Sequence, residues 1–408
     1  MAEFYKNKGI QRFYRLIILL IILMFFGEPY GVTLIGSAYR YIFAALIVVS
    51  LLFFVVTVQK IWLDPLDRFP LLVTKISWGL LLLSIPFWDT MLNVYSYVGI
   101  SVAFILYLHD FRFTNKLLVW LVFLSFVLTA FEYFTQHFLF VNVVHDKVMD
   151  EELFGGSLGV FRAKGIFFGP LSAGVFVVMA FFLNNQNIWL LLAALLVCFF
   201  ANSRMGMLIL SIPLLILLLK NRKPIYLFGV LVVVGISIAL ILKYAPHVLA
   251  SIERISMVGD LESNEDRIFF WKTGIELFLR YPLYYIVFGN NGYYNSLYDN
   301  NPESGWICLL TDNGLVGFFF YLIPIVYCFY KFLQRRSYYN FVITGLLFMV
   351  NFLLTAHLSG TGNLMYWLVM FELYNRAKYG YGKLDSPNIP RLGISGGPHS
   401  ILRNKINA

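Results

Sequence analysis

The sequence predicts an all-α fold, a polytopic integral membrane protein with about twelve transmembrane helices. Of its 408 residues, 60% are hydrophobic and only 13% are charged, which is too little charge to cover a soluble protein of this size. Apolar segments close to the roughly 20 residues needed to cross a bilayer recur along the chain. Lys and Arg gather in alternate loops between these segments, as they do on the cytoplasmic side of membrane proteins.

The predicted spans follow one another with short connections over most of the chain. Their approximate ranges are 16–35, 41–58, 70–88, 91–108, 117–135, 165–183, 188–202, 204–220, 224–243, 306–330, 339–356 and 361–376. The pairs 70–88/91–108 and 188–202/204–220 are tight hairpins, so their helices are expected to run antiparallel.

The distribution of Lys and Arg orients these spans. With the N-terminus inside, the cytoplasmic side collects Lys6, Lys8, Arg12, Arg15, Lys60, Arg68, Arg112, Lys116, Lys220, Arg222, Lys223, Lys331, Arg335 and Arg336. The C-terminal tail adds Arg376, Lys378, Lys383, Arg391, Arg403 and Lys405. The short turns on the opposite side hold only Arg40 and Arg204. Both termini are therefore predicted to be cytoplasmic, and topology explains the net charge of +9 without a nucleic-acid partner.

Residues 1–384 are predicted to form a single membrane domain with two long outer loops, 136–164 and 244–305. Long loops between spans carry function more often than short turns do. The segment 385–408 is rich in Pro, Gly and Ser and is predicted to be a disordered cytoplasmic tail.

The second outer loop is predicted to contain a helix that lies on or near the membrane. Ser263 and Asp266 have the spacing of a capping box and precede the amphipathic stretch "RIFFWKTGIELFLRYP". Pro282 is expected to end this helix, and the turn-rich "LYYIVFGNNGYYNSLYDNN" follows it.

Aromatic side chains are frequent in and after this helix. They could stack on sugar rings or bind sugar hydroxyls. An aromatic belt at the membrane interface explains them equally well. The candidates for glycan binding are Trp271, Tyr281, Tyr293 and Tyr294.

Lys and Arg on the outer side are candidates for a specific role, because membrane proteins place few cations there. A side chain at the mouth of a span can extend to lipid phosphates. Several that converge on one cavity would instead bind an anion, since guanidinium groups hold phosphate through paired hydrogen bonds. Arg267 and Arg280 fall on roughly opposite sides of an ideal helix, so at most one is expected to face such a cavity unless the chain turns at Pro282. The candidates are Arg162, Lys164, Arg204, Arg267 and Arg280.

Acids and histidines within or beside predicted spans are further candidates. Glu28, Asp89 and Glu132 are either functional or hydrogen-bond partners between helices. His357, in "TAHLSGTGN" at the outer end of a span, is either a titrating group or a structural side chain. No metal-binding, nucleotide-binding or serine-nucleophile pattern occurs, and the three cysteines lack the spacing of disulfide or zinc sites.

The stretch "NPESGWICLLTDNG", residues 301–314, carries two acids at the entrance of a span. Asn301 can cap the helix, Pro302 suits its first position, and Glu303 then lies in the first turn, where the helix dipole favours an acid. This position at the start of a helix explains Glu303 without giving it a catalytic role. Asp312 lies about 13 Å further along an ideal helix and is expected to be structural.

The order of four motifs resembles the O-antigen polymerase family (Wzy type), within the O-antigen ligase/polymerase superfamily. The motifs are "FRAKGIFFGP", "NSRMG", "EDRIFFWKTGIELFLRYPLYYIVFGNNGY" and "ESGWICLLTDNGLVGFFFYLIPIVY". The resemblance covers residues 160–335 and implies a GT-C-like membrane glycosyltransferase that needs neither metal nor nucleotide. It places the active site at the periplasmic face of the bacterial inner membrane.

Polymerases of this family join undecaprenyl-diphosphate-linked oligosaccharides. The growing glycan leaves its lipid diphosphate and is transferred to a sugar hydroxyl of the next lipid-linked repeat unit. The resemblance therefore gives Arg162, Lys164, Arg204 and Arg267 the role of neutralising the diphosphate, with Arg280 as a further candidate. A general base must lie near the acceptor hydroxyl. Membrane lipids and a chain-length regulator protein are the other partners that the resemblance implies.

Ligases of the superfamily carry a His, in a His–Asn context, near the end of the large outer loop. This chain has "NNPESGW" there, which favours a polymerase and makes Glu303 the leading candidate for the base, with His357 second. A ligase that transfers finished glycan to an acceptor lipid is one alternative. A flippase of lipid-linked sugars is another, disfavoured because no internal repeat is seen and the charges gather at outer helix ends.

Overall fold

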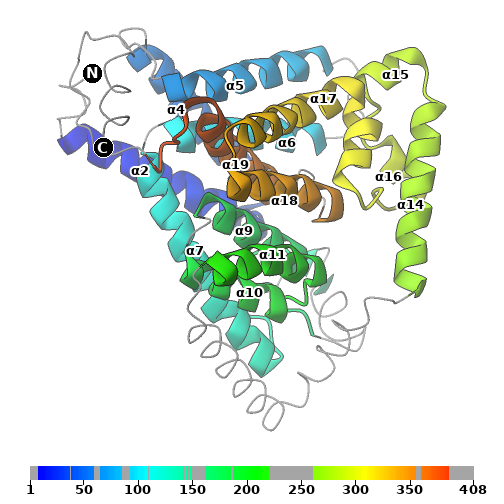
Figure 1. Ribbon diagram of the computed structural model, residues 1–408, viewed down its shortest axis with the longest axis horizontal. Helices are drawn as coiled ribbons and strands as arrows, with labels where there is room; N and C mark the ends of the chain where they lie inside the picture. Colours follow the sequence, from blue (N-terminus) through cyan, green and yellow to red (C-terminus); the bar gives the residue numbers. More distant parts are fainter. Residues whose placement is uncertain are drawn as a thin grey trace.

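The computed structural model describes residues 8–36, 38–58, 65–84, 92–108, 110–140, 143–144, 147–148, 161–184, 187–220, 261–354 and 360–385, which are almost entirely helical (Figure 1). The helices are α2 (Lys8–Phe26), α3 (Glu28–Ile35), α4 (Ala38–Val58), α5 (Pro65–Ser84), α6 (Leu92–Leu108), α7 (Phe111–Thr135), α9 (Pro170–Leu183), α10 (Ile188–Phe200), α11 (Arg204–Lys220), α14 (Leu261–Leu279), α15 (Leu283–Phe288), α16 (Tyr293–Tyr298), α17 (Gly305–Gln334), α18 (Tyr338–Leu354) and α19 (Gly360–Tyr379). Two short strands, β1 (Val143–Val144) and β2 (Lys147–Val148), pair antiparallel. The all-α prediction is confirmed for these residues.

Helices cover most of each predicted span that is described, although α9 begins only at Pro170 in the predicted span 165–183, and the predicted span 224–243 lies outside the described residues. The predicted span 16–35 is divided into α2 and α3 at Gly27, because Pro29 has no N–H with which to continue the helix. Among the described residues, α7 and α17 have the length and hydropathy of membrane-spanning helices. Several other apolar helices are shorter, so the number of spans stays a prediction.

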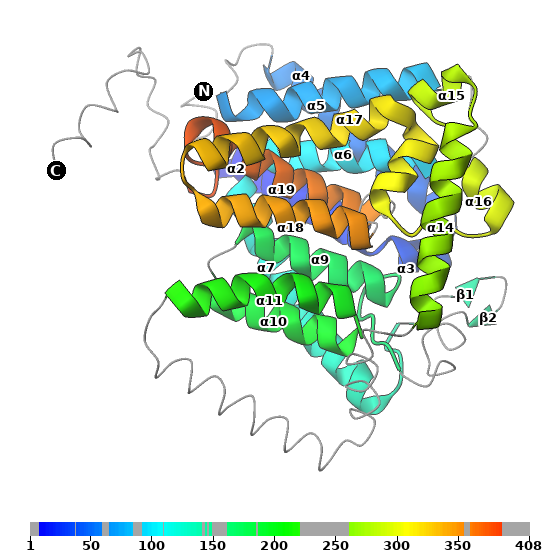
Figure 2. The same cartoon turned by 45° about the vertical axis from the view of Figure 1, so that its right-hand side comes forward.

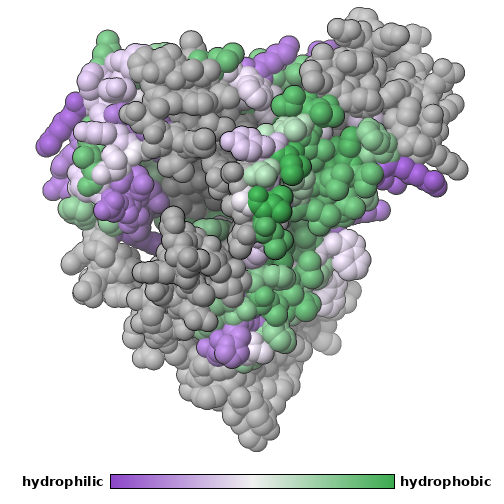
Figure 3. Space-filling model, turned by 180° about the vertical axis from the view of Figure 1, so that it is seen from behind, coloured by the Kyte–Doolittle hydropathy of each residue, from purple (hydrophilic) through white to green (hydrophobic). Residues whose placement is uncertain are grey.

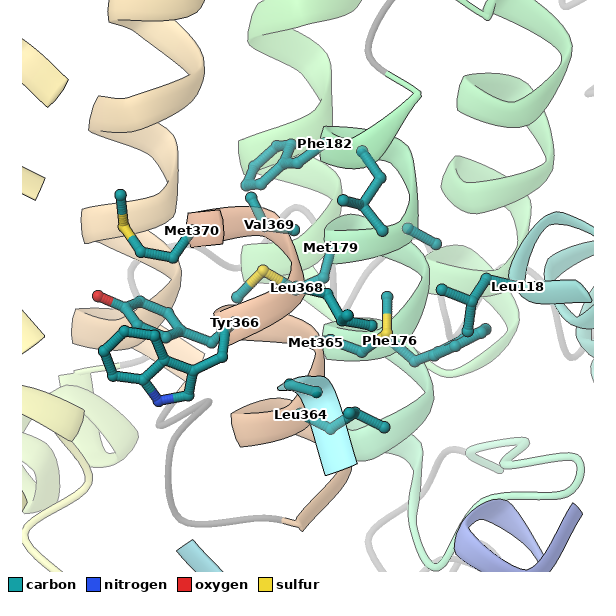
Figure 4. Packing of buried hydrophobic residues seen from close by; sticks show 14 of the residues in the cluster. Leu118, Phe176, Met179, Phe182, Leu364, Met365, Tyr366, Leu368, Val369 and Met370 are labelled. Atoms are coloured by element: carbon teal, nitrogen blue, oxygen red, sulfur yellow. The ribbon is translucent and has the colours of Figure 1, made fainter. Parts of the chain in front are cut away.

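Most of the long helices lie side by side in a bundle, with α19 in its interior (Figure 2). Helix α19 packs against α6, α9 and α17, and nearly every side chain from Gly362 to Leu373 is buried. Its Leu364, Met365 and Leu368 lie opposite Phe176 and Met179 of α9 (Figure 4). The core therefore forms around α19, the last helix in the part of the chain that the structure describes.

Contacts between distant segments bring many of the predicted cytoplasmic cations to one end of the bundle. Arg15 forms an ion pair with Asp110 at 3.0 Å. Arg335, after α17, donates to the backbone carbonyls of Arg376 (3.2 Å) and Lys378 (2.8 Å) near the end of α19. We call this the basic end.

Helix α14 lies crosswise over the opposite end of the bundle, which we call the α14 end (Figures 1 and 2). The Trp271 ring packs on Phe352 of α18 with centroids 5.0 Å apart. The predicted capping box is wrong, because α14 already begins at Leu261 and so contains Ser263 and Asp266. Leu and Glu are good helix formers, so Leu261 and Glu262 extend the helix on the N-terminal side of Ser263. The helix ends at Leu279, and Pro282 caps α15.

Large apolar side chains are exposed along the outside of the bundle. Trp120 of α7 and Trp189 of α10 are each 72% exposed. Seen from behind, a broad hydrophobic surface runs over the described helices (Figure 3). Contiguous apolar surface of this kind is typical of a protein that contacts lipid. The helices thus support a membrane protein, as the composition predicted.

Candidate functional site

Two of the predicted cationic motifs meet at the α14 end. The backbone N–H of Ala163 donates to the carbonyl of Phe200, the last residue of α10, at 3.1 Å. Phe161 and Ala163 also pack with Tyr133 and Phe200 in a small buried cluster. The segment "FRAKG" is thereby held against the turn "ANSR" between α10 and α11, although about forty residues separate them in the sequence.

Glu132, in the last turn of α7, fixes the position of this segment. Its buried carboxylate accepts hydrogen bonds from the backbone N–H groups of Lys164 (2.9 Å), Gly165 (2.8 Å) and Leu139 (3.1 Å). A carboxylate that accepts several backbone N–H bonds holds a loop more firmly than neutral acceptors do. Of the two roles open for Glu132, the structure supports that of a structural hydrogen-bond partner.

The three cations of these motifs differ in their surroundings. The Lys164 side chain is fully buried, and its Nζ lies 5.9 Å from the ring centroids of both Tyr30 and Phe138. Such rings attract a cation by their negative faces. Arg162 and Arg204 are partly exposed, and Arg204 begins α11. The two arginines are therefore better placed than Lys164 to reach a bound anion.

A second group of site candidates lies where α14 crosses the start of α17. Arg267 Nε donates to Glu303 Oε2 at 3.2 Å, and each side chain is about one-third exposed, at 34% and 33%. Asn300 lies within 3.5 Å of the other carboxylate oxygen of Glu303. The structure thus brings together one predicted phosphate-binding residue and the predicted base.

The helix that follows Glu303 begins later than the sequence predicts. α17 starts at Gly305 with Ser304 at the N-cap, and Glu303 has a left-handed backbone with φ of 50°. Asn301 Oδ1 accepts the Glu303 backbone N–H at 2.9 Å, which forms a tight turn in place of the first helical turn. The prediction that Asn301 caps the helix and that Glu303 lies in its first turn is wrong. Helix geometry therefore does not account for this acid.

Arg280 is not brought to Glu303. It follows the C-terminal end of α14 and is exposed, whereas Arg267 lies on the helix face that meets α17. This agrees with the expectation that at most one of these two arginines faces a common site. Its predicted role in binding a diphosphate stays a prediction.

The four aromatic candidates occupy different environments. The Tyr294 hydroxyl lies 2.7 Å from Thr273 Oγ1 and donates to the Phe270 carbonyl at 3.1 Å, so it links α16 to α14. Trp271 packs on Phe352, and Tyr293 is exposed. Burial raises the pKa of Tyr281, and nearby Asp312 raises it further, so its hydroxyl remains protonated at neutral pH.

Asp312 and His357 complete the predicted candidates. Asp312 accepts hydrogen bonds from the Thr311 hydroxyl (3.4 Å) and from the backbone N–H of Gly292, which tie the α15–α16 connection to α17. These contacts are those expected of a structural acid. His357 lies outside the described residues.

Together these side chains offer fixed positive charge and one accessible carboxylate at a single end of the bundle. In the part of the chain that the structure describes, no group of three or more His, Cys, Asp or Glu has an arrangement that could hold a metal ion. Arginines and a carboxylate can neutralise an anionic leaving group and accept a proton.

A pocket of about 550 Å³ opens at the other, basic end. Arg376 contributes to its lining but is already paired with Asp385 at 2.7 Å and Glu372 at 3.4 Å. An arginine that two carboxylates already neutralise has little charge left for an anion. The pocket is therefore separate from the predicted site.

Sequence reasoning did not single out Tyr30 and Phe138, which enclose Lys164, or Asn202 and Ser203 in the α10–α11 turn. Tyr30 and Phe138 are distant from Lys164 in the sequence and carry no motif. Asn202 did carry a signal, because Asn tolerates the left-handed backbone that a tight turn between helices requires.

Comparison with known proteins agrees with the predicted family resemblance over part of the chain. No curated protein matches the sequence. Residues 189–322 match the family model described as "O-Antigen ligase", a region that includes Arg204, Arg267 and Glu303. Residues 189–322 are thus similar to the O-antigen ligase/polymerase superfamily, consistent with the resemblance that the motifs predicted.

Proposed function

We propose that this protein is a polymerase of a bacterial surface polysaccharide such as O-antigen. It would transfer the growing glycan from undecaprenyl diphosphate to a new lipid-linked repeat unit at the periplasmic face of the inner membrane. The observation that carries the proposal is the meeting of Arg267 and Glu303 at the end of the bundle opposite the basic end. Members of the matched family are glycosyltransferase-like enzymes.

The proposed reaction needs a base and cations but no further reactant. The acceptor sugar hydroxyl gives its proton to Glu303 as its oxygen bonds to the anomeric carbon of the donor glycan. The bond from that carbon to the diphosphate oxygen breaks, and undecaprenyl diphosphate leaves with the electron pair. Arg162, Arg204 and Arg267 would stabilise the charge on this leaving group. Lys164 would add to the positive potential from its buried position.

The proposed topology has about twelve spans, cytoplasmic termini and a single membrane domain over residues 1–384. The concentration of cations at the basic end supports it, because cytoplasmic loops are enriched in Lys and Arg. A helix lying crosswise over the opposite end, as α14 does, suits a site for a lipid-linked substrate at the membrane surface. A chain-length regulator protein would be a further partner.

A polymerase is favoured over a ligase by Glu303, which stands where ligases of the superfamily carry a His. The description of the matched family favours the ligase as the second candidate. In a ligase the same cations would serve, but finished glycan would pass to a different acceptor lipid.

The glycan length ladder of a strain that lacks this gene separates these functions. We expect loss of long chains while single repeat units still reach the surface, with Arg204→Ala and Arg162→Ala failing to restore the ladder. Absence of even single units from the final acceptor would show a ligase. Repeat units that accumulate on the cytoplasmic face would show a flippase.

A further inference from the structure

The turn between α10 and α11 contains two adjacent buried polar side chains that form no side-chain hydrogen bonds within the described part of the chain. Asn202 is 4% exposed and Ser203 is 5% exposed. Neither amide atom of Asn202 nor Oγ of Ser203 has a hydrogen-bond partner in the part of the chain that the structure describes, and all three atoms are buried. The next residue is Arg204.

Such a pair is costly unless something else binds it. A buried polar group without a partner loses its hydrogen bonds to water and gains none in return, and this turn holds three such atoms. Ser203 also cannot turn away freely, because a Cβ placed on Gly174 or Gly206 would lie 2.9 Å from its Oγ. The hydroxyl thus lies close to the backbones of α9 and α11.

The backbone reinforces the arrangement. Asn202 has a left-handed conformation with φ of 53°, which fixes the direction of its side chain relative to α11. The same turn receives the segment 161–165 through the bond from Ala163 to Phe200. The unpartnered atoms therefore lie beside the backbone that carries Arg162 and Arg204.

The chemistry of these atoms indicates what they bind. The Asn202 amide presents both a donor and an acceptor, and the Ser203 hydroxyl can act as either. A phosphate at neutral pH offers acceptors and could satisfy only the donors. A sugar hydroxyl or acetamido group offers both donors and acceptors, so it can form hydrogen bonds with the Asn202 amide and the Ser203 hydroxyl together.

We propose that Asn202 and Ser203 form a subsite for the sugar that is joined directly to the diphosphate. This inference rests on the proposed function and deepens it, because it separates recognition of the sugar from recognition of the phosphates. Arg204 neutralises the diphosphate, and the two preceding residues read the sugar attached to it.

The test uses Asn202→Gly and Ser203→Ala. Glycine keeps the left-handed backbone that Ala would strain, so Asn202→Gly removes the side chain with its amide without straining the turn. Ser203→Ala removes the hydroxyl without adding atoms between Gly174 and Gly206. Gln136→Gly is the matched control, because Gln136 is an exposed amide residue with φ of 57°.

Binding is measured on the purified full-length protein in lipid nanodiscs with two probes, undecaprenyl diphosphate and the same lipid carrying its repeat unit. We expect each variant to weaken binding of the glycan-bearing probe about tenfold and to leave the bare lipid diphosphate unchanged. Arg204→Ala should weaken both probes, and Gln136→Gly neither.

Equal loss for both probes would overturn the inference and assign the turn to the phosphates. Unchanged binding of both would show that the turn holds only water. If the wild-type protein binds neither probe, the proposed function itself fails. Thermal unfolding midpoints identify a variant that fails to fold, and the other variant then decides.

Discussion

Glu303 combines a strained backbone with an ion pair that contributes little to stability. A non-glycine residue with positive φ costs of order 1 kcal/mol or more, and such strain gathers at functional sites. The pair with Arg267 is one-third exposed, and pairs of that kind contribute about 0.2–1 kcal/mol. Replacing Glu303 should therefore affect chemistry far more than folding.

Glu303→Gln is expected to lower glycan polymerisation by at least about a hundredfold while the protein remains folded, because the amide cannot accept the hydroxyl proton. Asp299→Asn is the matched control, since Asp299 is an exposed acid with φ of 50° just before the same helix. The rate of chain growth from purified lipid-linked repeat units measures both. Full activity of Glu303→Gln would remove Glu303 from the role of base.

Glu132 is the residue on which the position of the cationic segment depends. Glu132→Ala leaves three backbone N–H groups without this acceptor, and the two buried ones, of Lys164 and Gly165, each cost about 1–3 kcal/mol. Glu132→Gln retains one acceptor oxygen and should be milder. Limited proteolysis is expected to cleave near residue 164 in Glu132→Ala but not in Glu276→Gln, an exposed acid on α14. Equal protection of both would show that the segment holds itself in place.

At the scale of elements, α17 is interrupted where the α15–α16 connection meets it. Gly314 has φ of 62° and ψ of −165°, a conformation that is almost restricted to glycine. A Cβ on Gly314 would lie 2.5 Å from the Val287 carbonyl oxygen, and one on Gly289 would lie 2.3 Å from the Asp312 carbonyl. Two glycines thus let the backbone at the end of α15 contact the backbone of α17 directly.

Gly314→Ala should be strongly destabilising, by about 3 kcal/mol or more, since it combines backbone strain with a clash against main-chain atoms that cannot move aside. Gly345→Ala in α18 is the control, because its Cβ would meet only the Phe329 ring at an ordinary 3.5 Å. The unfolding midpoint in detergent compares them. A Gly314→Ala midpoint equal to that of Gly345→Ala would mean that the kink is not required.

Hydropathy was sufficient to predict the long helices of the bundle, because one apolar run of suitable length is a local property. It did not predict the short helices α15 and α16, which lie in the stretch interpreted as a turn-rich loop. The turn at Glu303 is local, but its sequence signal, the Asn301 side chain, suits a helix cap equally well. Hydropathy also did not predict the break at Gly314, since that break depends on Val287 and Gly289, which arrive from another part of the chain. Glu132 illustrates the same limit for the site. Its partners Lys164 and Gly165 lie about thirty residues away, and no spacing rule connects them.

At the scale of the whole molecule, residues after α19 close the basic end. Lys383 forms an ion pair with Asp67 of α5, and its Nζ donates to the carbonyls of Tyr107 (2.8 Å) and Leu108 (3.2 Å) at the end of α6. Both charged side chains are buried. Glu372 of α19 accepts the backbone N–H of Lys383 at 2.9 Å. The segment after α19 thereby joins α5, α6 and α19.

Lys383→Met should destabilise the whole bundle by about 3–5 kcal/mol, because it removes the cation that pairs with the buried negative charge of Asp67. The double variant Asp67→Asn with Lys383→Met removes that charge, and we expect it to recover part of the loss. Lys378→Met is the control, since Lys378 is an exposed lysine five residues before Lys383. This substitution should change stability by less than about 0.5 kcal/mol. Denaturant unfolding followed by tryptophan fluorescence measures all three. If the double variant is as unstable as Lys383→Met alone, the unpaired charge is not the cause, and the lost bonds to the end of α6 would account for the effect.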